Sequence, residues 1–234
     1  MKKLSIIIPV FNEEKTIDAV ITKVKKTTIS GIKKEIVVVD DGSSDHTHNL
    51  LEKHHGLILI THKKNSGKGG AIKTGLVKAS GDFILIQDAD LEYDPKYYGV
   101  LLEPIIENKA KVVFGSRLKN YPLNLWGKNK TVLPTHLIAN KFLTLLTNLL
   151  YGSNLTDMET GYKVFKKEVI NGLKLNSRKF DFEAEVTAKI LKKRVKIIEI
   201  PILTSPRTYK EGKKIGWKDG LSAIWTLIKY RFTN

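Results

Sequence analysis

The stretch Phe83-Ile84-Leu85-Ile86-Gln87-Asp88-Ala89-Asp90-Leu91-Glu92-Tyr93 passes from a wholly apolar run directly into an acidic segment. A short apolar run of this kind is typical of a buried strand, and side chains two residues apart in an extended segment point the same way. Asp88 and Asp90 can therefore address one hard cation where the strand ends, and that cation can hold a diphosphate. An Asp-x-Asp pair alone is more often a solvated turn, so the interpretation depends on the surrounding sequence.

Apolar, β-branched runs alternate with helical patterns around this stretch. The segments that we expect to form strands are residues 4–9, 35–39, 57–61, 83–87 and 112–116. Apolar residues recur at helical spacing between them, first from Ile17 to Val24 with Asn12 as the expected N-cap, and again from Ala71 to Ala79. The alternation predicts an α/β fold, with a Rossmann-like, mostly parallel sheet and helices on both faces.

The composition is that of an ordinary globular protein, with 41% hydrophobic and 27% charged residues among 234. This length suits one domain, which we expect to span residues 1–234. The absence of cysteine rules out a disulfide framework, and the chain begins with a strand pattern rather than a signal peptide. The longest strongly apolar stretch, residues 142–151, is far shorter than the roughly 20 residues that cross a bilayer. We therefore expect a cytoplasmic protein without a spanning segment.

The net charge of +16 is concentrated in the second half of the chain. Residues 1–117 contain 18 Lys and Arg against 15 Asp and Glu, whereas residues 118–234 contain 22 against 9. A basic surface attracts nucleic acid, anionic lipid or a phosphorylated substrate about equally well on charge alone. No helix-turn-helix, zinc-finger or RNA-recognition motif accompanies the charge, which argues against a non-catalytic nucleic-acid-binding protein.

Polar residues gather at the expected carboxyl ends of the strands. The first strand is followed by Asn12, the second ends in Asp40 and Asp41, and the fourth leads into Asp88 and Asp90. Ligands of parallel α/β sheets bind at this edge, so the three segments are expected to share one crevice. Adjacent carboxylates such as Asp40 and Asp41 repel one another unless a cation or a hydrogen-bond donor faces one of them.

The turn Asn65-Ser66-Gly67-Lys68-Gly69-Gly70-Ala71 matches neither the Walker loop nor the dinucleotide-binding fingerprint. Its glycines fit two interpretations. One is a close approach of the backbone to a diphosphate at a helix start, with Lys68 near the phosphates. The other is a tight turn that requires a positive φ angle.

Six motifs occur in a fixed order along nearly the whole chain. They are Ile-Pro-Val-Phe-Asn-Glu-Glu from residue 8, Val-Val-Asp-Asp-Gly-Ser-Ser-Asp from 38, Asn-x-Gly-Lys-Gly-x-Ala from 65, Gln-Asp-Ala-Asp-Leu-Glu from 87, Gly-Ser-Arg from 115 and Asp-Met-Glu-Thr-Gly-Tyr-Lys-Val-Phe from 157. This combination resembles family-2 glycosyltransferases, and more narrowly the polyprenyl-phosphate hexose synthases of the dolichyl-phosphate mannose synthase type. The resemblance implies a GT-A fold.

For the nucleotide-sugar donor, the resemblance implies a base site at the ends of the first two strands. Pro9, Phe11 and Glu13 would form its floor, Val38 would pack against the base, and Asp40 would accept the imino N–H of the base. Uracil and guanine both carry this N–H group, so UDP and GDP both remain candidates.

The resemblance also implies a metal and diphosphate site. Asp88, Ala89 and Asp90 would bind Mg²⁺ or Mn²⁺ together with the diphosphate. Glu92 departs from the pattern, because the mannose synthases often carry Gln at this place, and it would add a third oxygen ligand. The basic residues implied at the donor phosphates are Lys68, Arg207 and Lys213.

On the acceptor side, the resemblance implies that Arg117 meets a phosphate. A guanidinium suits this role because it binds phosphate with two parallel hydrogen bonds and stays charged at any working pH. Lys128 and Lys130 lie where relatives carry further basic residues. Asp157 occupies the place of a catalytic base in related enzymes, and here it either acts as a base or orients Arg117, Lys163 or the sugar.

The implied reaction is an inverting, metal-dependent transfer of a hexose from a nucleoside diphosphate to a polyprenyl or dolichyl monophosphate. Residues 1–117 would bind the nucleotide sugar, and the basic residues 118–234 would bind the acceptor. A soluble sugar or a protein hydroxyl is the alternative acceptor. The base, the sugar, the polyprenol and the oligomeric state are left open by the sequence.

Two amphipathic segments, residues 136–151 and 217–232, could meet the membrane that holds such a lipid. Trp225, Tyr230 and Phe232 lie among basic residues in the second segment, which is typical of a helix at a membrane interface. The same pattern also fits ordinary core packing. Because the implied acceptor is a lipid, we expect peripheral association with the anionic cytoplasmic face of a membrane.

Overall fold

The structure is a computed structural model, and it describes residues 1–119, 134–208, 212, 214 and 216–233. The strands are β1 Lys2–Val10, β2 Ile32–Asp40, β3 Ile58–Thr61, β4 Phe83–Ile86, β5 Val112–Ser116, β6 Lys163–Lys166 and β7 Ile197–Pro201. The helices are α1 Ile17–Lys26, α2 Thr47–Glu52, α3 Lys68–Lys78, α4 Tyr98–Ile106 preceded by the 3₁₀ turn η1 Pro95–Tyr97, α5 Pro134–Tyr151, α6 Lys167–Asn171, α7 Phe182–Lys192 and α8 Trp217–Phe232.

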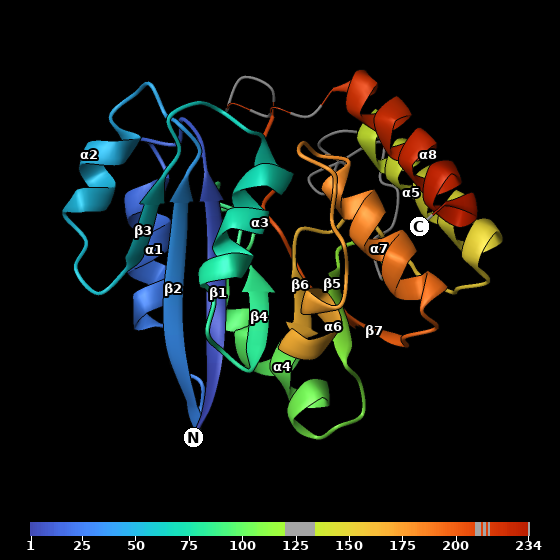
Figure 1. Cartoon of the computed structure of the whole chain (residues 1–234), viewed down its shortest axis with the longest axis horizontal. Helices are drawn as coiled ribbons and strands as arrows, with labels where there is room; N and C mark the ends of the chain where they lie inside the picture. The colour runs from blue at the N-terminus through green and yellow to red at the C-terminus, as the bar shows by residue number, and fades with distance from the viewer. Residues whose placement is uncertain (120–133, 209–211, 213, 215, 234) are drawn as a thin grey trace, which may run out of the picture.

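The strands within the described residues form one sheet in the order β3-β2-β1-β4-β6-β5-β7 (Figure 1). Every neighbouring pair is parallel except those of β6, which runs antiparallel to both β4 and β5. This confirms the mostly parallel sheet expected from the sequence. The carboxyl ends of β1, β2 and β4 therefore meet at one edge, as Ile7 pairs with Val37 on one side and with Ile86 on the other.

Each face of the sheet is covered by helices. Along β1, Ile6 and Ile8 belong to the core that includes α1 and α4, whereas Ile7 belongs to the core that includes α3, α6 and α7. This alternation follows from the two-residue period of a strand, and a strand buried on both faces has to be continuously apolar. Both cores consist mainly of aliphatic side chains that are fully or nearly fully buried.

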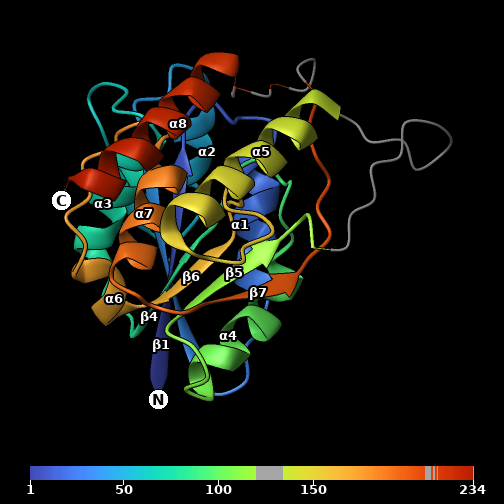
Figure 2. The same ribbon diagram turned by 90° about the vertical axis from the view of Figure 1, so that its right-hand side faces the viewer.

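Helices α5 and α8 form an outer layer beside α7 (Figures 1 and 2). A third core joins them, with Leu143 from α5, Ala184 and Ala188 from α7, and Leu227 and Tyr230 from α8. Among the described residues, no helix combines the length and apolarity that a bilayer crossing requires.

The structure corrects one local expectation from the sequence. Helix α1 begins at Ile17 and its N-cap is Thr16, so the prediction that Asn12 caps this helix was wrong. Asn12 instead adopts a positive φ of 51°, and its side-chain oxygen accepts a hydrogen bond from the backbone N–H of Ser44 at 2.8 Å. Asn12 therefore joins the loops after β1 and β2, which is possible because asparagine tolerates the left-handed region.

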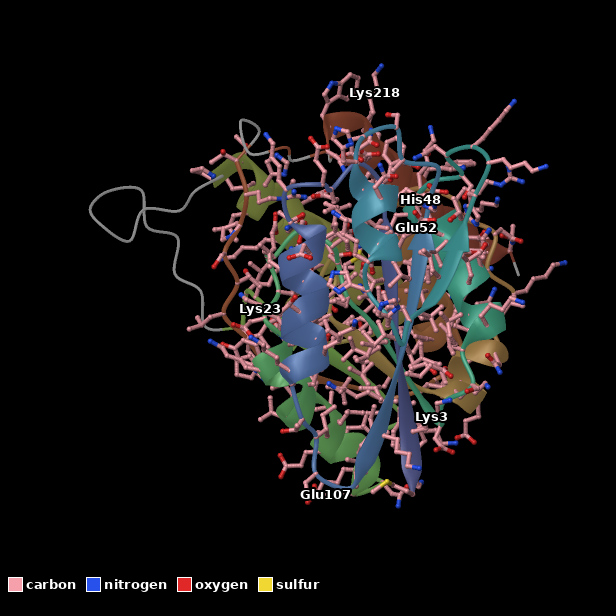
Figure 3. The ribbon with its side chains drawn as sticks, turned by 90° about the vertical axis from the view of Figure 1, so that its left-hand side faces the viewer. Lys3, Lys23, His48, Glu52, Glu107 and Lys218 are labelled. Atoms are coloured by element: carbon pink, nitrogen blue, oxygen red, sulfur yellow. The ribbon has the colours of Figure 1, made fainter. Side chains whose placement is uncertain are left out.

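The amino ends of the central strands are joined by Glu35 on β2. Its carboxylate accepts hydrogen bonds from Lys3 Nζ at 2.5 Å, Ser5 Oγ at 2.6 Å and Ser80 Oγ at 2.6 Å. Burial works to raise the pKa of Glu35, but the hydrogen bonds from Lys3, Ser5 and Ser80 outweigh it and lower the pKa to about 2. Lys3 lies near one end of the molecule and Lys218 near the other (Figure 3), so this cluster is far from the carboxyl edge of the sheet.

We predict that Glu35→Gln lowers the free energy of unfolding by about 1–3 kcal/mol at pH 7. Because the folded-state pKa is lowered, the stabilisation is complete above the ordinary value of 4.5 and is lost as the pH falls toward about 2. Urea unfolding at pH 7 and pH 3 should therefore show a smaller difference between wild type and variant at the lower pH. Glu168→Gln, which removes an exposed pair with Lys111, is the control and should change stability little. A difference that does not change with pH would contradict the assignment.

Candidate active site

A cavity of about 460 Å³ opens at the carboxyl edge of the sheet. Its walls come from the segments that follow four strands, with Phe11 after β1, Asp41 after β2, Asp88 after β4 and Arg117 after β5. The predicted convergence of separate strand ends on one crevice is therefore confirmed. The opposite wall comes from the second half of the chain, including Glu183 at the start of α7.

The acidic loop after β4 lies against this cavity, which is lined by Asp88, Ala89, Asp90 and Glu92. Asp90 accepts a hydrogen bond from the backbone N–H of Glu92 at 3.1 Å. Burial, and then the charges of Asp88 and Glu92, raise the pKa of Asp90 to about 7, although Arg207 works against them. The negative charges of Asp88, Asp90 and Glu92 repel one another, so a cation bound among them would be stabilised.

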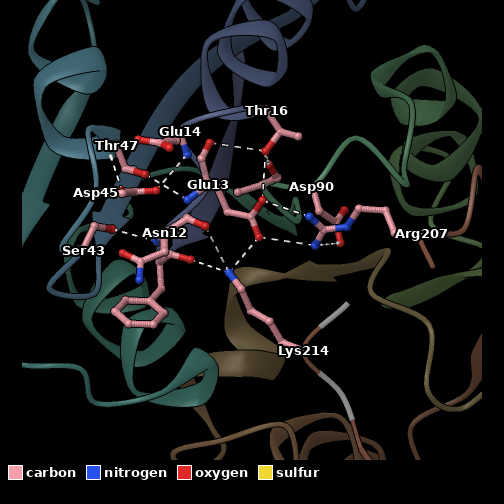
Figure 4. Close-up of polar contacts among 12 residues, drawn as sticks. Asn12, Glu13, Glu14, Thr16, Ser43, Asp45, Thr47, Asp90, Arg207 and Lys214 are labelled. Atoms are coloured by element: carbon pink, nitrogen blue, oxygen red, sulfur yellow. Dashed lines mark hydrogen bonds and ion pairs between the residues drawn. The ribbon is translucent and has the colours of Figure 1, made fainter. Parts of the chain in front are cut away.

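Two basic side chains from the segment after β7 contact the carboxylates of Glu13 and Asp90 (Figure 4). Arg207 lies 3.1 Å from the Asp90 carboxylate and 3.0 Å from that of Glu13. Lys214 Nζ lies 2.8 Å from the other oxygen of Glu13. Arg207 also donates its backbone N–H to Glu92 at 3.1 Å. The segment after β7 is therefore bound to the loops after β1 and β4.

Lys68 lies at the start of α3 and is largely buried in the cavity wall. Its ammonium is 2.8 Å from Asp88 and 3.1 Å from Glu183. Burial works against its charge, but Asp88 and Glu183 raise the pKa of Lys68 above its ordinary value. Lys68 therefore remains a fixed cation beside the acidic loop.

The glycines on either side of Lys68, Gly67 and Gly69, are required by close contacts with the backbone. Gly67 has a φ of 84°, and a β-carbon added there would lie 2.3 Å from the backbone oxygen of Arg178. A β-carbon at Gly69 would lie 2.7 Å from the backbone oxygen of Ser177. The turn thus requires a positive φ angle, as one interpretation stated, and the close approach within the structure is made by the segment before α7.

Arg117, which lines the cavity, forms a two-bonded ion pair with Asp157. Arg117 Nε is 2.7 Å from one oxygen of Asp157, and Nη2 is 2.8 Å from the other. Burial opposes the charge of Arg117, but Asp157 raises the pKa of this guanidinium well above its usual range. Asp157 is fully buried and does not line the cavity, while Arg117 does. Of the roles considered for Asp157, the geometry matches the orientation of Arg117.

Two predicted base contacts lie behind the cavity surface. Val38 is fully buried in the core, and Asp40 accepts hydrogen bonds from the backbone N–H of Ser43 at 3.0 Å and from His48 at 3.1 Å. Their contacts with a base stay predictions. Of the basic residues expected at the phosphate sites, Lys128, Lys130 and Lys213 lie outside the described residues.

Asp41 has a role that the sequence did not assign. Its carboxylate accepts hydrogen bonds from the backbone N–H groups of Ser66 at 2.9 Å and Gly67 at 2.8 Å, and it contacts His62 Nδ1 at 2.6 Å. Donors therefore face both Asp40 and Asp41, as the repulsion between adjacent carboxylates requires. Asp41 anchors the turn that carries Lys68.

Three cavity residues, from the segment before β6 and from α7, were not assigned a role from the sequence. They are Glu159, Gly161 and Glu183. A β-carbon at Gly161 would lie 2.3 Å from the Asp88 carboxylate, and the Gly161 N–H donates to Tyr93 Oη at 2.8 Å. The motif that contains Glu159 and Gly161 was visible in the sequence, but its contact with the acidic loop depends on the antiparallel insertion of β6.

Comparison with known proteins gives the family. The family model described as "Glycosyl transferase family 2" matches residues 5–173, which is more than half of the chain. The chain belongs to glycosyltransferase family 2. It is therefore an enzyme that transfers a sugar from a nucleotide sugar, and the non-catalytic alternative is removed.

Two relatives match almost the whole of this glycosyltransferase. One is the UDP-N-acetylglucosamine–dolichyl-phosphate N-acetylglucosaminyltransferase of Methanococcus voltae, with 29% identity over 97% of this chain and 95% of that protein. The other is the dolichol-phosphate mannosyltransferase of Pyrococcus furiosus, with 29% identity over 97% of this chain but 64% of that protein.

Among solved structures, glucosyl-3-phosphoglycerate synthase from Mycobacterium tuberculosis is similar to this glycosyltransferase. The two superpose with a TM-score of 0.76 over 100% of this chain and 80% of the other, at 18% sequence identity. At this identity the likeness concerns the fold alone. It confirms the GT-A fold that the sequence motifs imply.

We predict that Gly161→Ala weakens nucleotide-sugar binding by roughly tenfold, because the new methyl group would displace the Asp88 carboxylate. Calorimetric titration with UDP- and GDP-sugars measures the effect, and thermal unfolding reports the accompanying strain. Gly99→Ala is the matched control, since a β-carbon there meets nothing within 4 Å. Equal donor affinity in wild type and Gly161→Ala would show that the position of Asp88 does not depend on this contact.

Proposed function

We propose that this glycosyltransferase transfers a hexose, with inversion, from a nucleoside diphosphate sugar to a polyprenyl monophosphate at a membrane surface. The observation that carries the proposal is a single cavity lined both by the acidic residues Asp88 and Asp90 and by the guanidinium of Arg117, which Asp157 holds in place. The names of both whole-chain relatives, which act on dolichyl or dolichol phosphate, support the choice of acceptor. We assign residues 1–117 chiefly to the donor and residues 118–234 chiefly to the acceptor.

The donor would lie along the loops after β1, β2 and β4. Phe11 and Glu13 line the cavity on one side, and the acidic loop lines it on another. Lys68 and Arg207 lie beside Asp88 and Asp90, so both cations are within reach of a diphosphate bound there. The UDP of the solved neighbour supports a nucleoside diphosphate as the leaving group.

The acidic loop also fits a divalent cation. Carboxylate oxygens are the ligands that Mg²⁺ and Mn²⁺ prefer, and Mg²⁺ commonly takes only one or two of them and completes its shell with phosphate and water. Among the residues that the structure describes, no group of three acidic or histidine side chains is gathered closely enough to hold a metal alone. Asp88 and Asp90 would therefore hold it, and Glu92 as a third ligand stays a prediction.

When bound, such a cation would neutralise charge on the departing diphosphate, as Mn²⁺ and Mg²⁺ with UDP in the solved neighbours suggest. The residues of this chain would do the rest. Arg207 and Lys68 would hold the diphosphate from either side of the acidic loop. Their fixed positive charge stabilises negative charge that develops during the reaction.

Arg117 would position the acceptor phosphate for attack. Asp157 binds one edge of the guanidinium and so fixes its orientation, and Arg117 lines the cavity. A phosphate monoester is already anionic near neutral pH, so the reaction needs no strong general base. This explains how Asp157 can serve the reaction while its carboxylate is fully committed to Arg117.

We predict that Arg117→Lys raises the requirement for polyprenyl phosphate roughly tenfold or more, because lysine keeps the charge and loses the planar, two-bonded geometry. The donor dissociation constant should change by less than about twofold. A transfer assay with Mn²⁺, a panel of UDP- and GDP-sugars and a short polyprenyl phosphate measures the first value, and calorimetry measures the second.

The control for this comparison is Arg194→Lys, at an exposed arginine after α7. If donor binding weakens as much as acceptor use in Arg117→Lys, Arg117 belongs to the diphosphate site. If the wild type ignores polyprenyl phosphate and instead glycosylates a soluble hydroxyl acceptor, the proposed acceptor is wrong.

The proposed membrane contact is supported by the exposed faces of α5 and α8. On α8, large apolar side chains recur every three or four residues and form one stripe, with Trp225 66% exposed. A similar stripe on α5 includes Leu149, which is 75% exposed. The exposed members of the two stripes are Ile138, Phe142, Leu145, Leu149, Trp217, Leu221, Trp225, Ile228 and Phe232.

The helices α5 and α8, which carry these stripes, are neighbours (Figure 2). Both helices also carry positive charge. Lys218, Lys229 and Arg231 belong to α8, where Asp219 is the acidic residue, and α5 carries Lys141 without an acidic residue. The inner residues of both helices pack in the third core, so core packing and interface contact use different faces of the same helices. We propose that the outer faces lie in the interface of an anionic membrane on its cytoplasmic side.

We predict that the protein sediments with vesicles that contain anionic lipid and that high salt weakens this binding, because salt screens exposed charges. The double variant Leu149→Ser with Trp225→Ser should reduce the vesicle-bound fraction at least about tenfold. Val77→Ser is the control, since Val77 on α3 is 83% exposed and lies outside both stripes. Unchanged sedimentation of the double variant, or an equal loss in Val77→Ser, would refute the proposed contact.

A further inference from the structure

Within the described residues, three buried side-chain atoms have no hydrogen-bond partner, and all three belong to residues that line the active-site cavity. They are Glu159 Oε1, Glu183 Oε1 and Arg207 Nε. Leaving a buried polar atom without a partner costs about 1–3 kcal/mol, so such atoms are rare in folded proteins. Two of these atoms still face an opposite charge, because Glu183 Oε1 lies 3.1 Å from Lys68 Nζ and Arg207 Nε lies 3.9 Å from Glu92 Oε1. Glu159 Oε1 is therefore the atom whose missing partner a bound ligand would supply.

Glu159 differs from the other two. The Glu183 carboxylate forms ion pairs with Lys68 and Lys163, and the Arg207 guanidinium forms ion pairs with Glu13 and Asp90. Glu159 forms neither a hydrogen bond nor an ion pair with any residue that the structure describes, so the whole carboxyl group is available to a ligand.

The charges around Glu159 are already matched. Asp157 is paired with Arg117, and Glu183 with Lys163. Burial raises the pKa of Glu159 to about 7, and Glu183 and Asp157 add to the effect of burial, although Lys163 and Arg117 oppose it. Near neutral pH this carboxyl can therefore both donate and accept a hydrogen bond.

The position of Glu159 is fixed from both sides. Before it, Asp157 is bound to Arg117, and the backbone N–H of Met158 donates to Thr144 Oγ1 at 3.2 Å. After it, Thr160 Oγ1 donates to the backbone oxygen of Gly115 at 2.5 Å, and Gly161 packs against Asp88. Because the residues on both sides of Glu159 are held by these contacts, its side chain is well positioned to discriminate between ligands.

The chemistry of the ligand group follows from this environment. The two phosphate-bearing parts of the proposed substrates have cations at their sites, Lys68 and Arg207 for the diphosphate and Arg117 for the acceptor. A carboxyl group without a cation disfavours a phosphate but suits a neutral group with polar hydrogens. Between a diphosphate and an acceptor phosphate, that neutral group is the sugar.

We infer that Glu159 is a specificity-determining residue that hydrogen bonds a hydroxyl or acetamido N–H group of the transferred sugar. This inference rests on the proposed function for the assignment of the sugar to this part of the cavity. It names no particular sugar, because hydroxyl and amide N–H groups present the same donor to the carboxyl. Its energetic consequence is discrimination among donors that carry the same nucleotide.

The test compares sugar recognition with nucleotide recognition in the same protein. Calorimetry gives the dissociation constants of UDP, GDP, UDP-N-acetylglucosamine, UDP-glucose and GDP-mannose for the wild type, Glu159→Gln and Glu159→Ala. For the best donor, Glu159→Ala should lose at least about tenfold of the affinity that the sugar adds to the bare nucleotide. Affinity for the bare nucleotide should stay within about twofold. Glu159→Gln should keep more of the sugar preference, because its amide also donates and accepts.

Deoxy analogues of the best donor sharpen the comparison. The analogue that lacks the contacted group should bind the wild type as weakly as it binds Glu159→Ala, whereas other deoxy positions should remain sensitive to the substitution. Glu103→Gln on α4 is the matched control and should leave every constant unchanged. Thermal unfolding confirms that the variants fold, and the nearly isosteric Glu159→Gln keeps the test available if Glu159→Ala does not.

Two outcomes would overturn the inference. One is an unchanged ranking of sugars in Glu159→Ala, and the other is a wild type in which the sugar adds nothing to nucleotide affinity. Because these measurements need no acceptor, they are separate from the transfer assay. Failure to use polyprenyl phosphate with intact sugar discrimination by Glu159 would refute the proposed acceptor and support the role of this residue.

Discussion

The active site depends on two ion pairs of the Glu183 carboxylate, one with the ammonium group of Lys68 and one with that of Lys163. Lys163 is fully buried on β6, and Lys68 continues the chain of charges to Asp88. Burying an ion costs several kcal/mol unless a partner and further hydrogen bonds compensate, and here Lys163 also donates to the backbone oxygens of Met158 and Thr160. The network ties α3 and the acidic loop to β6 and α7, so the donor and acceptor sides of the cavity have one fixed spacing.

Much of this architecture could be predicted from the sequence because its signals are local. The apolar runs became β1 to β5 with only small changes at their ends, and the segment expected at residues 217–232 is α8. The metal and nucleotide loops were found because the carboxyl edge of a parallel sheet collects whatever polar residues follow each strand. Asp88 and Asp90 were located in this way, whereas Arg117 was identified from the resemblance to the family, and all three line the cavity.

What the sequence could not give depends on contacts between distant segments. Strand β6 has only four residues and begins with Lys163, whose charge hides its burial, so neither the strand nor its antiparallel direction was expected. The steric need for Gly67 is set by the backbone of Arg178, far along the chain. Glu159 lies within a recognised motif, but its lack of a partner among the described residues is a property of the folded cavity. That Glu159 is the unpaired carboxylate can be recognised only in the structure, which shows that the neighbouring acids form ion pairs with Arg117 and Lys163.

The antiparallel insertion of β6 between β4 and β5 also orders the folding of the protein in time. During synthesis, β1 to β4 and the acidic loop can assemble first, but the free edge of β4 stays unpaired until β6 has left the ribosome. An unpaired edge strand is prone to pair with other chains, so this is the stage at which aggregation threatens most. The same late segment brings Gly161 against Asp88, and the Gly161 N–H donates a hydrogen bond to the Tyr93 hydroxyl. A nascent chain that stops before β6 therefore carries the acidic residues without the support that fixes them, and catalytic competence arrives only when the sheet is closed.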